Sequence, residues 1–331
     1  MSGQTMDIAD GAGNAFTESD NDTAGPESSQ LEGTSEVLSN VLWTIAQPVL
    51  VLGSMFLVAT MVTGEWMNHK LYALFMIVLP IPLLIFAERI WTKRKDWILK
   101  PNELAEDGFW IAFGAMLWGP LISDFYKTPV SEGFRAIRDR SPLDFSMTPE
   151  SVWGLVAAAL LLRICSSFIY YWLHRVQHET LLFWRMHATH HHITKMSCMR
   201  GARTHPLEYL ALAVSTPIIL AFAGASDEVI AVSAAFGMWN GKLNHSNLPL
   251  RSMPVYDWVF ATAQQHHVHH SLDRRQSDSN YGCNIILWDR LFGTYCGDTQ
   301  VERIGAGRAV ALSIKEQLML AFYPNKRLTS L

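Results

Sequence analysis

Ten histidines occur in two short stretches of the sequence, eight of them at spacings that recur. "YYWLHRVQHETLLFWRMHATHHHITK" (170–195) contains H-x3-H and H-x2-H-H, and "QQHHVHHS" (264–271) repeats H-x2-H-H. Positions i, i+3 and i+4 of a helix lie on one face, so each motif is expected to present its imidazoles together. The eight histidines are His174, His178, His187, His190, His191, His266, His269 and His270. His192 and His267 fall on other faces by the same count and are poorer candidates.

Such a set of imidazoles predicts a metal centre. One zinc ion takes about four ligands, whereas eight to ten imidazoles suit two metals, each with about four or five nitrogens and an open position. Nitrogen ligands without Cys are compatible with Fe, Zn, Cu or Ni. Oxidation of unreactive C–H bonds beside a bilayer favours iron, because that chemistry needs a redox metal. A histidine-rich surface tract or metal buffer does not explain why H-x2-H-H occurs twice.

Other polar residues near these motifs could complete or support the centre. His245 in "GKLNHSNLPL" is favoured as a ligand, and His205 in "RGARTHPLEYL" is a further candidate, although either could be a polar helix cap. A ligating histidine usually donates its second N–H to a carboxylate or carbonyl. Asp289, Asp278 and Asn244 are the candidates for such support, although Asp289 could instead pair with its neighbouring arginine at a helix end.

Long apolar runs separate the histidine motifs from the N-terminus. Runs at 41–63, 71–90 and 152–172 are each about long enough to cross a bilayer, and a shorter one covers 108–125. The segment 207–241 contains two more apolar stretches, expected to form a hairpin or to dip into the membrane. The chain is therefore predicted to be an integral membrane protein with about four to six spans.

The charge distribution predicts an orientation. Residues 1–40 contain eight Asp or Glu and no Lys or Arg, a composition typical of a disordered tail. The basic cluster "TKRKDWILK" (92–100) follows the second run, and positive loops remain cytoplasmic. Alternating spans then place the N-terminus and both histidine motifs on the cytoplasmic side. The four isolated cysteines are expected to be reduced thiols, and no nucleic-acid partner is expected.

The ordered motifs "HRVQH", "HATHH", "THPLEY", "NHSN", "HHVHH" and "NYG…WDRLFGTY" resemble those of the fatty acid hydroxylase superfamily, the sterol desaturase-like group. The resemblance covers roughly residues 155–300. It implies an all-helical membrane bundle whose cytosolic, histidine-rich helical cap holds two non-haem iron ions. The expected domains are a tail (1–40), a transmembrane region (41–150), the histidine-motif domain (151–300) and a C-terminal tail (301–331).

The same resemblance implies hydroxylation or desaturation of a lipid C–H bond, with O2 as co-substrate. Its ligands carried onto this chain are the eight histidines above, with His245 as a ninth. One departure concerns position 241, where some members have a further histidine and this chain has Gly241. Reducing electrons must come from a separate ferredoxin-like or cytochrome-type donor with its reductase, since no G-x-G-x-x-G dinucleotide motif lies between a strand and a helix.

Two other classes of protein are alternatives. A histidine-rich metal transporter places its ligands near the bilayer midplane, whereas these histidines lie beyond the ends of the apolar runs. A zinc-dependent membrane hydrolase needs a general base beside the metal, and Glu179 follows His178 at the wrong offset for H-E-x-x-H. A lipid oxygenase is the favoured interpretation.

Overall fold

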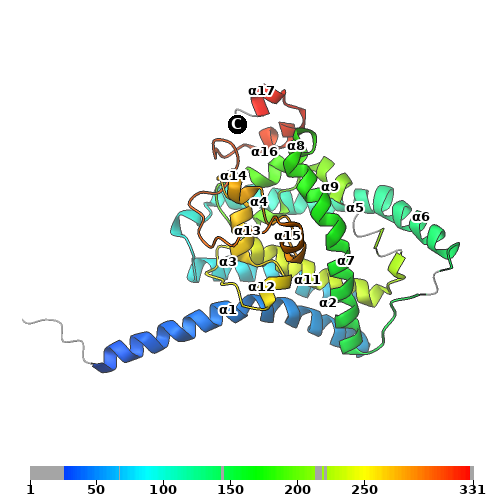
Figure 1. Ribbon diagram of the computed structural model, residues 1–331, viewed down its shortest axis with the longest axis horizontal. Coiled ribbons are helices and arrows are strands. Elements are labelled where there is room, and N and C mark those ends of the chain that lie inside the picture. Colours follow the sequence, from blue (N-terminus) through cyan, green and yellow to red (C-terminus); the bar gives the residue numbers. More distant parts are fainter. Residues whose placement is uncertain (1–25, 67, 143–144, 213–217, 220–221, 329–331) are drawn as a thin grey trace, which may run out of the picture. The chain divides into compact units, whose positions relative to one another are not determined.

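The computed structural model describes residues 26–66, 68–142, 145–212, 218–219 and 222–328 (Figure 1). The chain divides into two units, Met1–Asn40 and Val41–Leu331. The described residues are helical or irregular and contain no strand, only two isolated β-bridges. The predicted all-helical class is confirmed.

Four helical stretches are long and apolar enough to cross a membrane, namely Ser35–Thr63, Lys70–Ile90, Pro101–Asp139 and Val152–Glu179. Several of their large apolar side chains have no protein to pack against. Met116 is 80% exposed and Phe125 is 79% exposed, as lipid-facing side chains would be. The four stretches confirm a multi-pass membrane protein. In the segment 207–241 the described residues add no further candidate span, and residues 213–217 and 220–221 lie outside the description.

The first span is one continuous helix, whereas the second and third are each built from several helical segments. The first is α1 (Pro26–Thr63), and the second comprises α2 (His69–Ala73), the π-helix η1 (Leu74–Val78) and α3 (Pro80–Ile90). The third comprises α4 (Pro101–Ala112), η3 (Phe113–Trp118), α5 (Gly119–Ile122), η4 (Ser123–Lys127) and α6 (Thr128–Asp139). Both η3 and η4 are π-helices, which are often found at functional sites.

α1 extends into the segment that was predicted to be a disordered tail. Residues 1–25 of that segment lie outside the described residues, but the helix begins at Pro26. Proline suits the first helical turn, and a helix already nucleated in the apolar span can extend into the neighbouring segment without a new nucleation cost. The structure thus describes residues 26–40 as helical, where a disordered tail was expected.

The fourth span, α7 (Val152–Glu179), packs along α11 (Asp227–His245), and these two helices form the centre of the core (Figure 1). Ser151 caps α7 by accepting from the Gly154 N–H, and Ser226 caps α11 in the same way. Leu155 and Leu162 of α7 and Phe236 of α11 are buried in the same cluster. Both helices end in histidines that enter the candidate site.

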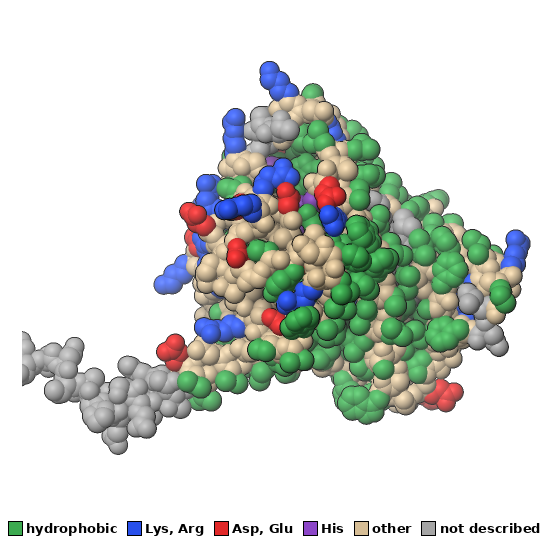
Figure 2. All heavy atoms as spheres, in the orientation of Figure 1, with side chains coloured by type: hydrophobic (Ala, Val, Ile, Leu, Met, Phe, Trp, Pro, Cys, Tyr) green, Lys and Arg blue, Asp and Glu red, His purple; other side chains and the backbone are tan. Residues whose placement is uncertain are grey.

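The remaining elements are short and carry or cover the histidines. They are η2 (Lys95–Trp97), α8 (Leu181–His191), η5 (Arg200–Ala202), α9 (Pro206–Leu212), α12 (Tyr256–Val259), α13 (Ala263–His269), α14 (Arg274–Ser277), α15 (Leu287–Phe292), α16 (Ile314–Met319), η6 (Leu320–Phe322) and α17 (Asn325–Leu328). Figure 2 shows hydrophobic side chains over α7 and α6 on the viewed face, whereas most charged side chains gather towards α14 and α17. The polarity of this face thus changes from the span to the helices beyond it.

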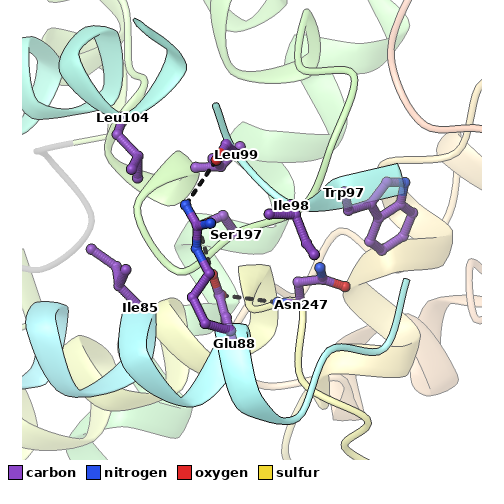
Figure 3. Close-up of a pocket in the computed structure, with 9 residues that line it drawn as sticks. Ile85, Glu88, Trp97, Ile98, Leu99, Leu104, Ser197 and Asn247 are labelled. Atoms are coloured by element: carbon purple, nitrogen blue, oxygen red, sulfur yellow. Dashed lines mark hydrogen bonds between the residues drawn. The ribbon is translucent and has the colours of Figure 1, made fainter. Parts of the chain in front are cut away.

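A buried carboxylate at the end of α3 ties two loops to the membrane region (Figure 3). Glu88 accepts from Ser197 Oγ (2.9 Å), the Cys198 N–H (2.7 Å) and the Asn247 N–H (2.9 Å). Ser197 and Cys198 follow α8, and Asn247 follows α11 by two residues. Glu88 therefore fixes the chain just beyond two histidine-bearing helices.

Candidate metal centre

Nine buried histidines meet in two groups, and each is at most 8% exposed. The five-histidine group contains His174, His178, His187, His191 and His269. The four-histidine group contains His190, His245, His266 and His270. In each group, one nitrogen from every ring lies within 4.8 Å of the others. All nine residues singled out as metal ligands from the sequence are thus brought together.

The H-x2-H-H motifs are divided between the groups in a reciprocal way. α8 gives His187 and His191 to the five-histidine group and His190 to the four-histidine group. α13 and its C-cap residue, His270, show the opposite division. His269 belongs to the five-histidine group, and His266 and His270 belong to the four-histidine group. In each motif the i, i+4 pair serves one group and the middle histidine the other. The shared helix face predicted from the spacing therefore lies between two sites.

Ring nitrogens in the five-histidine group face each other without a proton between them. His174 Nδ1 donates to the carbonyl of Tyr281 at 2.6 Å, and His187 Nδ1 donates to Glu208 Oε1 at 2.6 Å. The Nε2 atoms of the two histidines are then lone-pair acceptors, yet they lie 2.9 Å apart. Two lone pairs at this distance repel each other. A metal cation bound between the two nitrogens would remove that repulsion, because both could then act as ligands.

The four-histidine group has the same character. His245 Nδ1 donates to the Gly241 carbonyl at 2.8 Å, and His190 Nδ1 donates to the Arg203 carbonyl at 3.3 Å. Their Nε2 atoms face each other at 3.3 Å, and His266 Nε2 lies 3.0 Å from that of His245. The unprotonated Nε2 atoms of His190 and His245 thus again point at a common position.

Several buried nitrogens of these rings have no hydrogen-bond partner among the described residues. They are His178 Nε2, His191 Nε2 and His269 Nε2 in one group and His266 Nδ1 and His270 Nδ1 in the other. A buried polar atom without a partner costs about 1–3 kcal/mol. The three orphaned Nε2 atoms of the five-histidine group and the facing Nε2 atoms of both groups fit two metal cations, so the residues present suit the predicted centre.

The electrostatics keep these imidazoles neutral, as metal ligands must be. Burial lowers the pKa of His190, His191 and His266 well below the ordinary histidine value, and neighbouring imidazoles lower it further. Burial lowers the pKa of His245 to about 4. Neutral rings leave one nitrogen of each with a free lone pair.

Among the described residues, carboxylates hydrogen-bond to rings of the five-histidine group and to no ring of the four-histidine group. Glu208 is 2% exposed and holds His187 as described, and Asp278 Oδ1 lies 3.4 Å from His178 Nδ1. Asp278 was a candidate from the sequence, but Glu208 was missed. Its only signal was its place in "THPLEY", three residues after His205 at the start of α9.

Two cavities reach the four-histidine group. A polar cavity of about 160 Å³ is lined by ring atoms of His190, His245 and His266, together with Tyr170 and Glu208. A second cavity of about 330 Å³ is mostly apolar. Its lining includes residues of the second and third spans and of α11, among them Ile77, Ile81, Trp110, Ile111, Met238 and Lys242. Gly201, Gly241 and His245 line both cavities, so the two meet there.

Residues 159–294 match the family model for fatty acid hydroxylase, and this match covers the nine histidines. This part of the chain belongs to the fatty acid hydroxylase superfamily. The predicted resemblance is confirmed. No solved structure matches the chain significantly.

The curated relatives of the fatty acid hydroxylase domain have names that refer to lipids. The chain is 32% identical to ornithine lipid hydroxylase OlsE of Rhizobium tropici, over 43% of each chain. It is 26% identical to human alkylglycerol monooxygenase, over 69% of this chain and 49% of that one. It is 30% identical to fatty acid hydroxylase vlmA of a Lecanicillium species, over 48% of each. The chain thus spans about half the length of these relatives.

Asp289 and Asn244, two further candidates in the fatty acid hydroxylase domain, make no hydrogen bond to a histidine among the described residues. Asp289 accepts from the Tyr281 and Gly282 N–H groups and from Thr294, and so fixes the loop whose carbonyl holds His174. Burial raises the pKa of Asp289 to about 6. Asn244 donates to the carbonyl of Cys283. Both act on loops rather than directly on the rings.

His205 lies outside both groups. Its Nδ1 accepts from the Leu207 N–H and its Nε2 donates to the Leu318 carbonyl, as a helix cap does. His192 and His267 also lie outside the groups, as their helical positions predicted. Glu179, considered as a hydrolytic base, pairs with Arg175 at 2.7 Å and is half exposed. It does not face the histidines.

Proposed function

We propose that this chain is a membrane-bound lipid hydroxylase that uses O2 and two non-haem iron ions, one at each histidine group. The observation that carries the proposal is the convergence of buried, neutral imidazole nitrogens on two points beside a cavity that joins an apolar one. Family membership of residues 159–294 supports the same reaction class.

When bound, the iron pair supplies the reduction of O2 and the oxidation of an unreactive C–H bond. The overall reaction is R–H + O2 + 2 e⁻ + 2 H⁺ → R–OH + H2O. The two electrons come from a separate ferredoxin-like or cytochrome-type donor with its reductase. Loss of two hydrogens to give an alkene is the related outcome that the experiment below distinguishes.

The protein's own residues hold and orient the ligands. The carbonyl of Tyr281, that of Gly241 and the carboxylate of Glu208 each fix an Nδ1 proton, which turns Nε2 of the ring towards the metal position. The apolar cavity takes the hydrocarbon chain of the substrate and keeps water from it. The polar cavity is the place where substrate and O2 meet.

The relatives' names support a lipid substrate. They are a lipid hydroxylase, a monooxygenase acting on alkylglycerol and a fatty acid hydroxylase, so none is named as a transporter or hydrolase. We place the catalytic domain at residues 151–300 and the membrane region at 41–150. The basic cluster at 92–100 supports a cytoplasmic N-terminus and a cytoplasmic histidine centre.

Membranes supplied with 18O2, iron and a reductant-fed donor test this function. Lipid extracts are compared by mass spectrometry for the intact chain, His190→Ala and the matched control His192→Ala. We expect lipids with one labelled oxygen for the intact chain and for His192→Ala, and none for His190→Ala. A loss of two hydrogens instead identifies a desaturase.

Metal content, measured on the same purified proteins, sharpens the result. About two irons per intact chain are expected from the two groups. Purified protein that holds zinc and no iron contradicts the proposal, as does labelled lipid that is equally abundant with His190→Ala.

A further inference from the structure

The apolar cavity lies among elements of the membrane region. Ile77 belongs to the π-helix η1 of the second span, and Gly114 and Ala115 belong to the π-helix η3 of the third. Trp110 of α4 and Met238 of α11 complete its apolar wall. At about 330 Å³ its volume is at the lower end of that of small-molecule pockets. Its size and apolar lining suit part of a hydrocarbon chain.

One cation interrupts this apolar wall. Lys242 lies in the last turn of α11, is partly buried, and lines the cavity. Its Nζ donates to the Met238 carbonyl at 3.3 Å, and no carboxylate among the described residues lies within ion-pair distance of it. Burial lowers the pKa of Lys242, in keeping with the absence of a nearby carboxylate. An anion in the cavity would compensate the charge of its ammonium group.

Lys242 lies close to the metal centre along the same helix. It precedes His245 by three residues, a spacing that places the two Cβ atoms about 5–6 Å apart on one side of α11. Gly241 lies beside it, at the junction of the two cavities. A Cβ added to Gly241 would meet no heavy atom within 4 Å, so the position opens into free space.

A lysine near the end of a membrane helix can also simply extend its ammonium to the interface. That alternative predicts an ammonium directed away from the apolar cavity and into water. Lys242 lines the cavity together with Met199 and Met238, and its Nζ donates to the carbonyl of Met238 in that same wall.

We propose that Lys242 binds the anionic group of the lipid substrate in the apolar cavity, so that the oxidised carbon lies within a few bonds of that group. This inference rests on the proposed function for its reaction but not for its binding step. The hydrocarbon chain extends from Lys242 towards Ile77 and Trp110. The carbons next to the anion reach the polar cavity through the junction at Gly241.

Binding is measured by native mass spectrometry on the full chain in detergent. The three probes share one chain length: hexadecanoate, hexadecyl phosphate and hexadecanol. We expect both anions to bind more tightly than the alcohol, by roughly tenfold, as for a charge-assisted contact in a partly buried site. The first two probes distinguish a carboxylate-bearing lipid from a phosphate-bearing one. Equal retention of the alcohol overturns the proposal.

Substitutions at Lys242 test the cation itself. Lys242→Met keeps the volume and removes the charge, and it should abolish the preference for anions while leaving hexadecanol binding unchanged. Lys242→Arg should retain the preference. An unaltered preference in Lys242→Met means that the anions bind elsewhere or that the lysine merely reaches the interface, and either result overturns the proposal.

The junction is tested by filling it. Gly241→Leu should weaken the binding of all three probes, because a side chain there fills space shared by both cavities. Gly108→Leu is the matched control, since Gly108 also has no heavy atom within 4 Å of an added Cβ but lines neither cavity. Bound metal in both variants reports that the fold is intact. Undiminished binding to Gly241→Leu overturns the assigned route.

Repeating the measurement with His190→Ala separates this inference from the proposed function. That variant should fail to oxidise lipid and yet retain the preference for anions. Oxidation by the intact chain without any such preference contradicts the role of Lys242 alone. A preference for anions without oxidation contradicts the hydroxylase function alone.

Discussion

The two histidine groups differ in number and in surroundings. The five-histidine group is held by the carboxylates of Glu208 and Asp278 as well as by backbone carbonyls. The described bonds to Nδ1 in the four-histidine group come only from the carbonyls of Gly241 and Arg203. Three of its four rings line the polar cavity. From the five-histidine group His187 lines that cavity too, so the comparison indicates that the four-histidine group has the larger open side.

Gly241 explains part of this difference. A fifth ring at this position would occupy space that both cavities share, since an added Cβ there meets no heavy atom within 4 Å. The glycine instead contributes its carbonyl to His245. The departure from the family motif at position 241 thus coincides with the open side of the four-histidine group.

The largest expected effect is the loss of a metal on removing one ligand. His266→Ala leaves three rings in the four-histidine group and should lower the bound metal by about half, whereas His178→Ala leaves four rings in the other group and should retain it. Elemental analysis of the purified proteins provides the measurement.

His267→Ala is the matched control for this comparison. His267 is the neighbour of His266 on α13, but its Nε2 faces the Ser246 carbonyl and it belongs to neither group. Equal metal loss in the His266 and His178 variants would show that the two groups tolerate the loss of one ligand equally well.

A second prediction concerns the support of the four-histidine group. Glu88→Ala leaves the Ser197 hydroxyl and the Cys198 and Asn247 N–H groups without their acceptor. We expect the free energy of unfolding to fall by about 3 kcal/mol, since each buried donor without a partner costs about 1–3 kcal/mol. Thermal unfolding in detergent measures it.

Because Asn247 lies two residues after His245, metal should be lost from the four-histidine group first as Glu88→Ala unfolds. Glu88→Gln retains the side-chain shape and one acceptor oxygen, so it should lose less stability. Equal losses in the two variants would mean that the acceptor geometry at Glu88 is unimportant.

Helical spacing predicted which histidines meet but not how they divide. The motifs alone place His187, His190 and His191 on one face, which is correct. The division between two metal positions depends on how α8 crosses α7 and α13, and that crossing is set by tertiary packing. The all-helical class and the spans could be predicted because bilayer thickness imposes a long apolar run on each.

Two of the supporting carboxylates, Glu88 and Glu208, could not be predicted from the sequence, whereas Asp278 was a candidate. Glu88 lies at the end of an apolar span and Glu208 at the start of another apolar stretch, where each resembles a polar residue at a membrane boundary. Their hydrogen bonds join residues 109 and 21 positions away in the chain, respectively. Only the folded arrangement shows that Glu88 holds loops and that Glu208 holds a ring.

A third prediction tests the carboxylates that distinguish the five-histidine group. Glu208→Ala should weaken metal binding there by roughly 10–100-fold, the usual effect of removing the partner of a ligating histidine. Asp278→Asn should have a smaller effect, because its contact with His178 is 3.4 Å long and partly exposed. Competition with a chelator ranks the two affinities, and an equal or reversed order would contradict the assigned roles.

The smallest expected effect comes from His205. Its Nδ1 accepts from the Leu207 N–H at the start of α9, so His205→Ala removes a cap and should lower the free energy of unfolding by about 1 kcal/mol. His205→Asn can restore the same acceptor and should recover most of that stability. Metal content should be unchanged in both variants, because the ring is outside both groups. Metal lost from His205→Ala but kept by His205→Asn would point to an effect through α9 and Glu208, whereas metal lost from both would make His205 a ligand and raise the four-histidine group to five.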